Sequence, residues 1–524
     1  MITKIKNPIL RGFNPDPNIV KAGDTYYIVV SSFEWLPGVR VYSSKDLVNW
    51  EHETDILTSQ VNLRGNPRNC SVWAPQLSYA DGLFWLIFTD VKSVKRPFKD
   101  CHNYLITAPS VHGPWKAPVY LNSSGFDPSL FHDTDGRKWL LNEVWDYRIP
   151  RLNRSAGILL QEFDPVCENL IGKVYKIFDG THLAKTEAPH IYRHGGYYYL
   201  LTAEGGTGEG HSVTVCRSKS ITGPYELDPK FPMLTASDKP DSILRCSGHG
   251  SLVENGMGNW YMAYLCTRPL NGHAILGRET AIQEVIFTDD GWLRLKNGGN
   301  GPLLETDVVT EKETKQTIIT DFRDDFNNFK NGLKKEWNTL RILADESWCD
   351  LKSRPGHLRL VSGESPQSLF DHHILAIRQR DFCFSAETKM SYSPESFLQM
   401  AGLILYLNDG NYLYVYITFD EAHGRSLRIM RCVNDEFELN DEIIPLSDGE
   451  VSIKFETIGS GETGRFYYSV NSSDWQTAFG EENLLFLSGG YTGNFIGFSI
   501  SDAGNVDGSY ADFKYFEYKG FDEV

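Results

Sequence analysis

A repeat in the first 300 residues constrains the fold of this chain more than any other feature. A strand-like segment, a tight glycine turn and an aromatic strand-like segment recur five times, first as Asp16-Pro-Asn-Ile-Val before Gly23-Asp-Thr-Tyr-Tyr-Ile-Val. The five units open at Asp16, Trp73, Asp127, Glu187 and His249, at intervals of about 54 to 62 residues. Each interval holds one four-stranded sheet with its loops. With no long helical periodicity, the repeat predicts a five-bladed β-propeller over residues 1–305.

A second domain is expected after the repeat ends. From about residue 301 to 316 the chain is polar, and Glu311-Lys-Glu-Thr-Lys-Gln316 is typical of a connector. Beyond it, alternating runs such as Tyr412-Leu-Tyr-Val-Tyr-Ile417 indicate short antiparallel strands. The sequence therefore predicts an all-β chain, with a β-sandwich of the jelly-roll or concanavalin-like kind over residues 317–524.

Composition excludes several classes of partner and location. The 68 acidic residues against 51 basic ones give a net charge of -17, which repels phosphate backbones and anionic membranes. We therefore expect no nucleic acid and no membrane partner. No apolar segment near 18 residues and no signal-like start occur, so a cytoplasmic protein is expected. The nine cysteines never form a Cys-x-x-Cys pair, which indicates free thiols and no metal site.

The propeller repeat is expected to bring candidate catalytic residues together at one end of the central channel. The first strand of each blade lines the central channel, so the five opening residues should meet at one mouth of it. Three of them are carboxylates, Asp16, Asp127 and Glu187, and like charges crowded together raise at least one pKa. Structural stability alone would not favour such crowding, although a lone Asp beside Pro is usually a turn former. We interpret the three acids as a catalytic group.

Paired carboxyl groups are the chemistry of glycosidic bond hydrolysis. One donates a proton to the leaving oxygen and the other activates water or attacks carbon. If Asp16 and Glu187 lie on opposite sides of the channel, about 6.5 to 9.5 Å apart, water fits between them and the anomeric configuration inverts. Asp127 beside Glu187 would raise the pKa of that acid and keep it protonated near neutral pH.

Ordered motifs along the whole chain resemble one family. The motifs are Asn14-Pro-Asp-Pro-Asn18, Trp73-Ala-Pro75, Gly125-Phe-Asp-Pro-Ser-Leu-Phe-His132, Thr186-Glu-Ala-Pro-His190 and Gly277-Arg-Glu-Thr-Ala-Ile-Gln283. They are similar to the β-xylosidases of glycoside hydrolase family 43, in the two-domain form with a C-terminal sandwich. The resemblance implies an inverting exo-enzyme that releases xylose from the non-reducing ends of β-1,4-xylooligosaccharides. It also implies Asp16 as general base, Glu187 as general acid and Asp127 as the residue that modulates the pKa and orientation of the acid.

The same resemblance implies a set of sugar-binding residues. Arg278 resembles an arginine that hydrogen-bonds sugar hydroxyls, and Phe495 resembles a sandwich residue that closes the pocket. The remaining residues of the set are Phe33, Trp73, Trp145, Thr207 and His249. No cofactor is implied; His249 resembles a histidine that helps some relatives hold a hydrated calcium ion, but the sequence shows no oxygen cage for one. Relatives of this architecture are often dimers or tetramers, so a homo-oligomer is expected.

Three alternatives remain open from the sequence. The first is an α-L-arabinofuranosidase, or a bifunctional enzyme, on the same scaffold. The second is a non-catalytic sugar-binding propeller with a lectin-like sandwich, and the third is a retaining fructosidase. One acid has no assigned role: Glu143, near Trp145, is expected to face solvent or a sheet partner.

Overall fold

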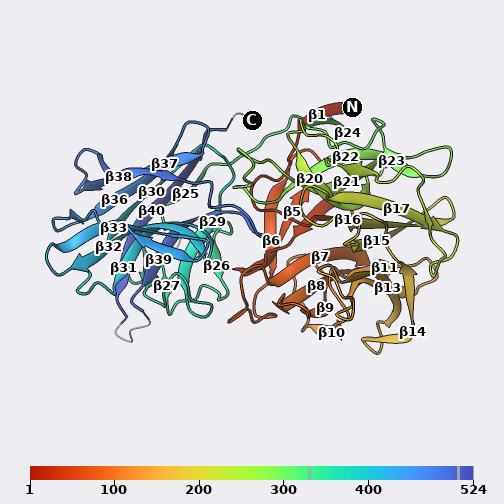
Figure 1. Cartoon of the computed structure of the whole chain (residues 1–524), viewed down its shortest axis with the longest axis horizontal. Coiled ribbons are helices and arrows are strands. Elements are labelled where there is room, and N and C mark those ends of the chain that lie inside the picture. The colour runs from red at the N-terminus through yellow and green to blue at the C-terminus, as the bar shows by residue number, and fades with distance from the viewer. Residues whose placement is uncertain (328–329, 331, 504–507, 523–524) are drawn as a thin grey trace.

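The structure, a computed structural model, describes residues 1–327, 330, 332–503 and 508–522. In that part of the chain the regular elements are all β-strands. Two lobes lie side by side: the propeller, from red to green, and the sandwich, from cyan to blue (Figure 1). The prediction of an all-β chain with two domains is confirmed. The described residues include no helix long and apolar enough to cross a membrane.

Five antiparallel sheets form the propeller, four with four strands and one with five. Blade 1 contains β2 (Asn18–Ala22), β3 (Thr25–Val30), β5 (Gly38–Ser44) and β6 (Glu51–Leu57). Blade 2 contains β7 (Ser71–Ala80), β8 (Leu83–Ser93), β9 (Asp100–Ala108) and β10 (Val119–Asn122). Blade 3 contains β11 (Ser129–His132), β12 (Lys138–Trp145), β13 (Ser155–Asp164) and β14 (Asn169–Phe178).

The last two blades complete the ring. Blade 4 contains β15 (Glu187–His194), β16 (Tyr197–Glu204), β17 (Ser212–Ser218) and β18 (Glu226–Leu227), with β19 (Leu234–Thr235) also on β17. Blade 5 contains β20 (Arg245–Glu254), β21 (Trp260–Thr267), β22 (Glu279–Phe287) and β23 (Leu293–Leu295). Strand β2 packs beside both β7 and β20, so blade 1 meets its two neighbours in the ring.

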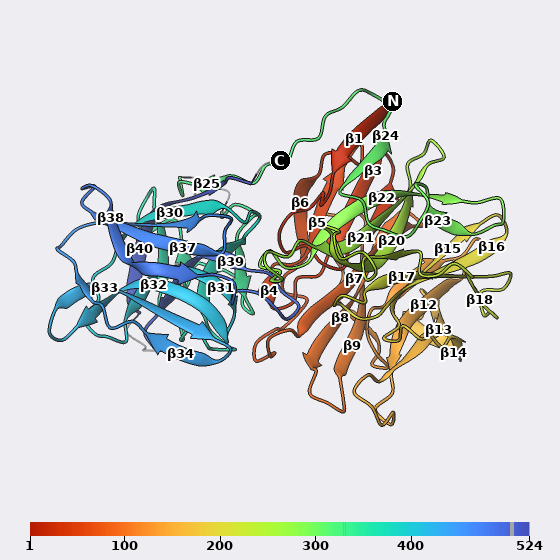
Figure 2. The same ribbon diagram turned by 45° about the horizontal axis from the view of Figure 1, so that its top comes forward.

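A separate two-stranded sheet marks the end of the propeller. Strand β1 (Ile2–Lys6) pairs antiparallel with β24 (Glu305–Val309). Strand β24 begins at the boundary predicted at residue 305 and ends at Val309. Figure 2 shows the connector from β24 to the sandwich passing along the outer surface, near both labelled chain ends.

Two packed sheets form the sandwich. The first contains β25 (Phe322–Asp324), β27 (Cys349–Asp350), β28 (Leu358–Val361), β30 (Phe384–Ser391), β36 (Val451–Ile458), β37 (Thr463–Val470), β38 (Gln476–Asn483) and β40 (Tyr510–Gly520). The second contains β26 (Asn338–Leu340), β29 (His373–Arg378), β31 (Met400–Asn408), β32 (Asn411–Asp420), β33 (Gly424–Val433), β34 (Glu436–Leu439), β35 (Ile444–Pro445) and β39 (Phe495–Ser501). Their facing side chains, such as Phe455, Phe498 and Phe516, are fully buried in one core.

The propeller chain also supplies one strand to the sandwich. Strand β4 (Trp35–Leu36) pairs antiparallel with β26, placing Trp35 opposite Leu340. The Trp35 ring stacks on Phe495 with ring centroids 3.7 Å apart, and Phe13 packs edge-on against the same phenylalanine at 5.8 Å. One buried aromatic cluster therefore includes residues of both domains. This contact brings loops of the sandwich to the mouth of the propeller.

Candidate active site

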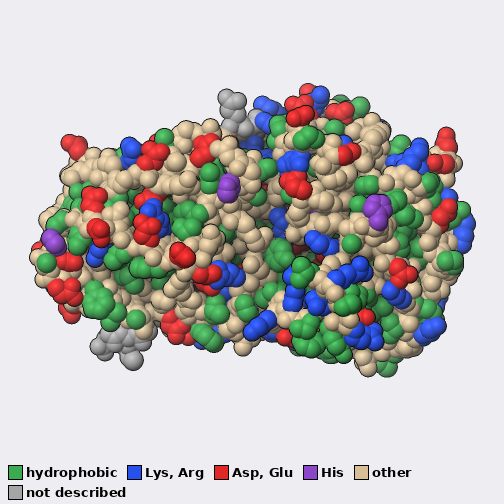
Figure 3. Space-filling model, viewed as in Figure 1, with side chains coloured by type: hydrophobic (Ala, Val, Ile, Leu, Met, Phe, Trp, Pro, Cys, Tyr) green, Lys and Arg blue, Asp and Glu red, His purple; other side chains and the backbone are tan. Residues whose placement is uncertain are grey.

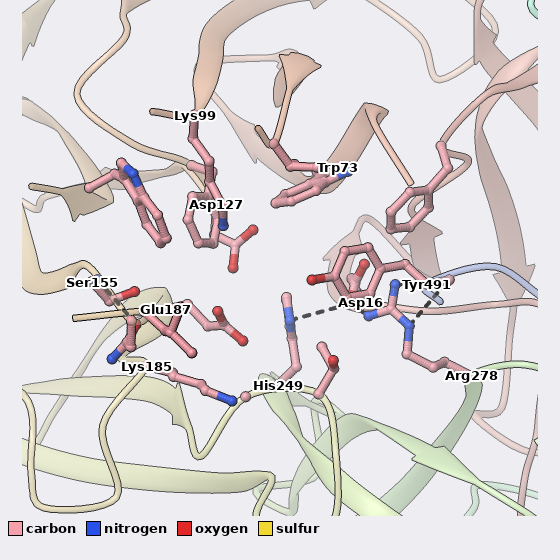
Figure 4. Close-up of a pocket in the computed structure, with 18 of the residues that line it drawn as sticks. Asp16, Trp73, Lys99, Asp127, Ser155, Lys185, Glu187, His249, Arg278 and Tyr491 are labelled. Carbon is pink, nitrogen blue, oxygen red and sulfur yellow. Dashed lines mark hydrogen bonds and ion pairs between the residues drawn. The ribbon is translucent and has the colours of Figure 1, made fainter. Parts of the chain in front are cut away.

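A pocket of about 690 Å³ opens at the propeller mouth. It is lined by the five blade-opening residues, Asp16, Trp73, Asp127, Glu187 and His249 (Figure 4). Three of them, Asp16 (φ 55°), Asp127 (φ 52°) and His249 (φ 52°), have left-handed backbone conformations, which are uncommon outside glycine. Such strain persists where the surrounding structure over-determines it, typically at functional sites. The opening residues of the five repeat units therefore line one cavity.

Asp16 lies at the start of blade 1 in a cationic setting. Its Oδ1 pairs with the Arg278 guanidinium at 2.7 Å and lies 3.6 Å from His249 Nδ1, while its Oδ2 accepts a hydrogen bond from the Ser31 hydroxyl at 2.7 Å. Burial alone would raise the pKa of Asp16, but Arg278, His249 and the Ser31 hydroxyl outweigh it and lower that pKa. Asp16 is therefore held as a carboxylate.

Glu187 and Asp127 lie on the other side of the pocket (Figure 4). Burial, together with the negative charge of Asp16, raises the pKa of Glu187 to about 7, although the Lys99 ammonium opposes the rise. The pKa of Asp127 is raised well above its ordinary value by burial and by the Glu187 carboxyl. The backbone N–H of Ala188 donates to Asp127 Oδ2 at 3.1 Å, which ties the two acids together. Burial and the Glu187 carboxyl thus favour the protonated form of Asp127, whereas the sequence predicted a charged Asp127 that raises the pKa of Glu187.

Lys99 supplies the positive charge on this side, and the sequence did not indicate it. Its ammonium lies over the rings of Phe126, Trp145 and Trp73, at 3.9, 4.3 and 5.0 Å from their centroids. The pKa values of Asp127, Glu143 and Glu187 are all raised by burial, and the Lys99 ammonium opposes each of these rises. It therefore serves as a shared counter-charge for three buried acids.

Glu143 is the third of these acids, and it does not face solvent. It lies on β12, its side chain is fully buried, and its backbone N–H donates to Phe126 O at 3.0 Å. Burial raises the pKa of Glu143 to about 8, with Lys99 opposing and Glu187 adding to the shift. Glu143 is therefore a neutral acid behind the pocket wall at pH 7.

The sandwich domain completes the pocket through Tyr491, not through Phe495. Phe495 is fully buried behind the pocket, against Trp35 and Phe13. The backbone carbonyl of Tyr491 accepts hydrogen bonds from Arg278 Nε at 3.2 Å and Nη2 at 3.0 Å. The two loops approach closely, since a Cβ on Gly277 (φ +74°) would lie 2.7 Å from the Gly493 Cα.

The other predicted binding residues all line the pocket. The Phe33 and Trp73 rings lie 6.0 Å apart, and each lies against Tyr491, at 6.0 and 5.6 Å. Trp145 is fixed by a hydrogen bond from its Nε1 to Pro97 O at 2.9 Å. Thr207 and Arg278 also line the cavity. The aromatic walls can stack on the apolar face of a sugar, and the Arg278 fork suits a pair of hydroxyls.

The surroundings of His249 do not resemble a calcium cage. Among the described residues, no group of three or more His, Cys, Asp or Glu side chains is arranged to hold a metal ion. The carboxylate beside His249 belongs to Asp16, whose oxygens are engaged by Arg278 and Ser31. Burial lowers the pKa of His249, so its imidazole is neutral at pH 7.

Comparisons with known proteins agree with this geometry. Residues 5–293 match the family described as glycosyl hydrolases family 43, and residues 323–519 match the β-xylosidase C-terminal concanavalin A-like domain. A β-xylosidase of Bacillus subtilis is 43% identical over 98% of this chain and 99% of its own length. A non-reducing end α-L-arabinofuranosidase of Bacteroides ovatus is 32% identical over 99% and 95%.

Solved structures show the same architecture. The crystal structure of a xylan β-1,4-xylosidase from Bacillus halodurans superposes with a TM-score of 0.95 at 46% identity, covering 98% of this chain and all of that one. The likeness includes both domains. The chain therefore belongs to glycosyl hydrolase family 43, in the form that carries a C-terminal concanavalin-like domain.

Proposed function

We propose that this protein is an inverting exo-β-xylosidase that releases xylose from the non-reducing ends of β-1,4-xylooligosaccharides. One observation carries the proposal: two carboxyl groups in different electrostatic settings, Asp16 paired with Arg278 and Glu187 across from it, line opposite sides of a pocket (Figure 4). Asp16 has a lowered pKa and is the general base, whereas Glu187 has a pKa of about 7 and is the general acid. Titratable groups whose environments separate their pKa values mark acid and base assignments.

Hydrolysis then proceeds in a single displacement. Asp16 takes a proton from a water molecule, whose oxygen attacks the anomeric carbon while the bond to the leaving oxygen breaks. Glu187 donates its proton to that leaving oxygen. Asp127, tied to Glu187 through the Ala188 N–H, keeps the acid oriented and the local charge low.

The pocket walls support attack on a terminal sugar. Tyr491, Phe33 and Trp73 enclose one side, and Arg278 can donate to hydroxyls of the sugar between them. Lys99, whose ammonium lies over both the Trp73 and the Trp145 ring, adjoins this side, and a leaving sugar fits beside Lys99 and Trp145. These walls favour the release of single xylose units from chain ends over cleavage within a polysaccharide.

An α-L-arabinofuranosidase on the same scaffold is the second candidate. A relative from Humicola insolens, 40% identical over 98% of this chain, is named a xylosidase/arabinosidase. Comparing kcat/KM on 4-nitrophenyl β-D-xylopyranoside and 4-nitrophenyl α-L-arabinofuranoside separates the two. We expect the xyloside to be preferred.

The proposed roles are tested with Glu187→Gln. We expect its kcat/KM on xylobiose to fall by about 10²- to 10⁴-fold, because general acid catalysis is lost. The exposed Glu168 gives a matched control, Glu168→Gln, which should keep wild-type activity. Absence of hydrolysis by the wild-type protein would instead favour a sugar-binding module.

We further propose that the chain forms a homo-oligomer, a dimer or a tetramer. Strand β14 is the outer strand of blade 3 and leaves Ile171 and Val174 exposed at 39% and 46%. An exposed edge strand with apolar side chains favours pairing with another chain. Light scattering coupled to size exclusion gives the mass; a mass of 59.4 kDa, that of one chain, would contradict the proposal.

A further inference from the structure

Tyr491 lies in the pocket as part of the loop that precedes β39, and its backbone is fixed at both ends. Its N–H donates to Asn69 Oδ1 at 2.8 Å, and its carbonyl accepts two hydrogen bonds from Arg278. The guanidinium of Arg278 in turn pairs with Asp16. The tyrosine is therefore held in place by its main chain, and its side chain is not needed for that anchoring.

The side chain is held as well. The ring lies edge-on to Trp73 at 5.6 Å, tilted against Phe33 at 6.0 Å, and 5.7 Å from the Arg278 guanidinium. These contacts use the faces and edges of the ring. They would be kept by a phenylalanine, so they do not account for the hydroxyl.

The hydroxyl has no protein partner among the described residues that line the pocket. No hydrogen bond joins it to any of them, although Asp16, Glu187 and His249 lie in the same cavity. In Figure 4 it points away from Arg278, toward the centre of the pocket above His249. Burial and the Glu187 carboxyl raise the pKa of Tyr491, so the hydroxyl keeps its proton at working pH and can donate it in a hydrogen bond.

We propose that the Tyr491 hydroxyl hydrogen-bonds one ring hydroxyl of the terminal pentopyranose in the pocket, which makes Tyr491 a specificity-determining residue supplied by the sandwich domain. The inference rests on the proposed function, because it takes the sugar to occupy the space between Asp16 and Glu187. A site built to pair with a sugar hydroxyl discriminates strongly against a sugar that lacks it. The sandwich domain would then contribute directly to sugar recognition, besides anchoring Arg278.

The test combines one substitution with substrates that each lack one hydroxyl. Tyr491→Phe and the wild-type enzyme are compared on 4-nitrophenyl β-D-xylopyranoside and on its 2-deoxy, 3-deoxy and 4-deoxy analogues. On the parent substrate we expect kcat/KM to fall about 5- to 30-fold in the variant, the size of one hydrogen bond. On one of the deoxy analogues the two enzymes should agree within about twofold, because the partner of the tyrosine is already absent.

A matched control removes a hydroxyl elsewhere. Tyr510 on β40 is 49% exposed, and Tyr510→Phe should leave all four kcat/KM values unchanged. Thermal melting shows whether Tyr491→Phe is folded. An equal fall on all four substrates would show that Tyr491 acts only on the shape of the site, and no fall on any would show that its hydroxyl contacts no sugar; either result overturns the inference.

A binding measurement separates this inference from the proposed function. D-xylose binding is followed by the fluorescence of the whole enzyme, since Trp73 and Trp145 line the pocket. Weaker xylose binding in Tyr491→Phe, by about fivefold or more, supports the hydroxyl contact even if the wild-type enzyme proved inactive on xylosides. Equal binding of xylose by both proteins, or binding by neither, would overturn it.

Discussion

At the scale of single residues, the site depends on two acids whose pKa values differ. Activity needs Asp16 ionised and Glu187 protonated, so the profile of kcat/KM against pH is bell-shaped. The alkaline limb falls as pH rises through about 7, where Glu187 loses its proton. The acidic limb lies below the range of an ordinary Asp, because the pKa of Asp16 is lowered. Rates on an aryl xyloside from pH 3 to 9 check this, and an alkaline limb near pH 4.5 would refute it.

Glu143 leads to a prediction about stability. Its pKa is about 8 in the folded protein but 4.5 for an ordinary Glu, so the unfolded state loses this proton first as pH rises. Wild-type stability should therefore decline between about pH 4.5 and 8 through this group. Glu143→Gln keeps the neutral shape, and we expect it to raise the free energy of unfolding at pH 8 by about 1 to 3 kcal/mol.

Urea unfolding at pH 5 and at pH 8 measures this difference. The gain should be small at pH 5, because Glu143 is then protonated in the folded protein and partly protonated in the unfolded one. The exposed Glu168 provides the control substitution, Glu168→Gln. Equal gains at both pH values would mean that Glu143 is not the titrating group.

Sequence patterns located some functional residues and missed others for identifiable reasons. Asp16, Asp127 and Glu187 occupy equivalent places in a repeat, so symmetry brings them together whatever their separation along the chain. Lys99 lies in the loop between β8 and β9, outside the strand pattern that repeats from blade to blade, and Tyr491 lies in the other domain. Phe495 begins β39, and its ring faces the shared aromatic cluster. No periodicity in the sequence distinguishes these two aromatic residues.

At the scale of elements, the two-residue strand β4 joins the propeller to the sandwich. Trp35 is 1% exposed and stacks on Phe495. It lies two residues after Phe33, which lines the pocket. We expect Trp35→Ala to reduce the free energy of unfolding by about 3 to 5 kcal/mol, because it opens a cavity in the shared cluster. It should also raise KM, because Phe33 loses its support.

Denaturant unfolding and steady-state kinetics on one preparation test both effects. Trp475, 41% exposed on the sandwich, gives the control Trp475→Ala, which should change neither quantity appreciably. A Trp35→Ala protein that loses stability with an unchanged KM would mean that the interface does not shape the pocket.

The blade strands could be predicted because each pairs with its sequence neighbour. Strand β4 could not, because β26 lies about 300 residues away.

At the scale of the whole molecule, two domains share one buried aromatic cluster. Arg378 on β29 donates from Nε to Phe13 O at 2.8 Å, and its Nη1 donates to Asn338 Oδ1 at 2.9 Å, so polar contacts reinforce the packing. We therefore expect calorimetry to show one cooperative transition for the full chain. Two separate transitions would indicate independent domains.

The sequence supports two domains but does not reveal their joint core, since each domain has its own strand pattern.

The distribution of surface charge differs from what the net charge suggests. The chain carries a net charge of -17, yet Lys and Arg side chains gather on the propeller half of one face, next to the sandwich (Figure 3). Net charge alone therefore says little about the surface near the site.

The account depends most on inversion by Asp16 and Glu187. Proton NMR of xylobiose hydrolysis shows which anomer of xylose appears first at the cleaved end, before mutarotation mixes the two. Initial α-xylose is the predicted result, because water activated by Asp16 attacks the face opposite the leaving group. Initial β-xylose would contradict the account, because retention requires one of the carboxylates to act as a nucleophile.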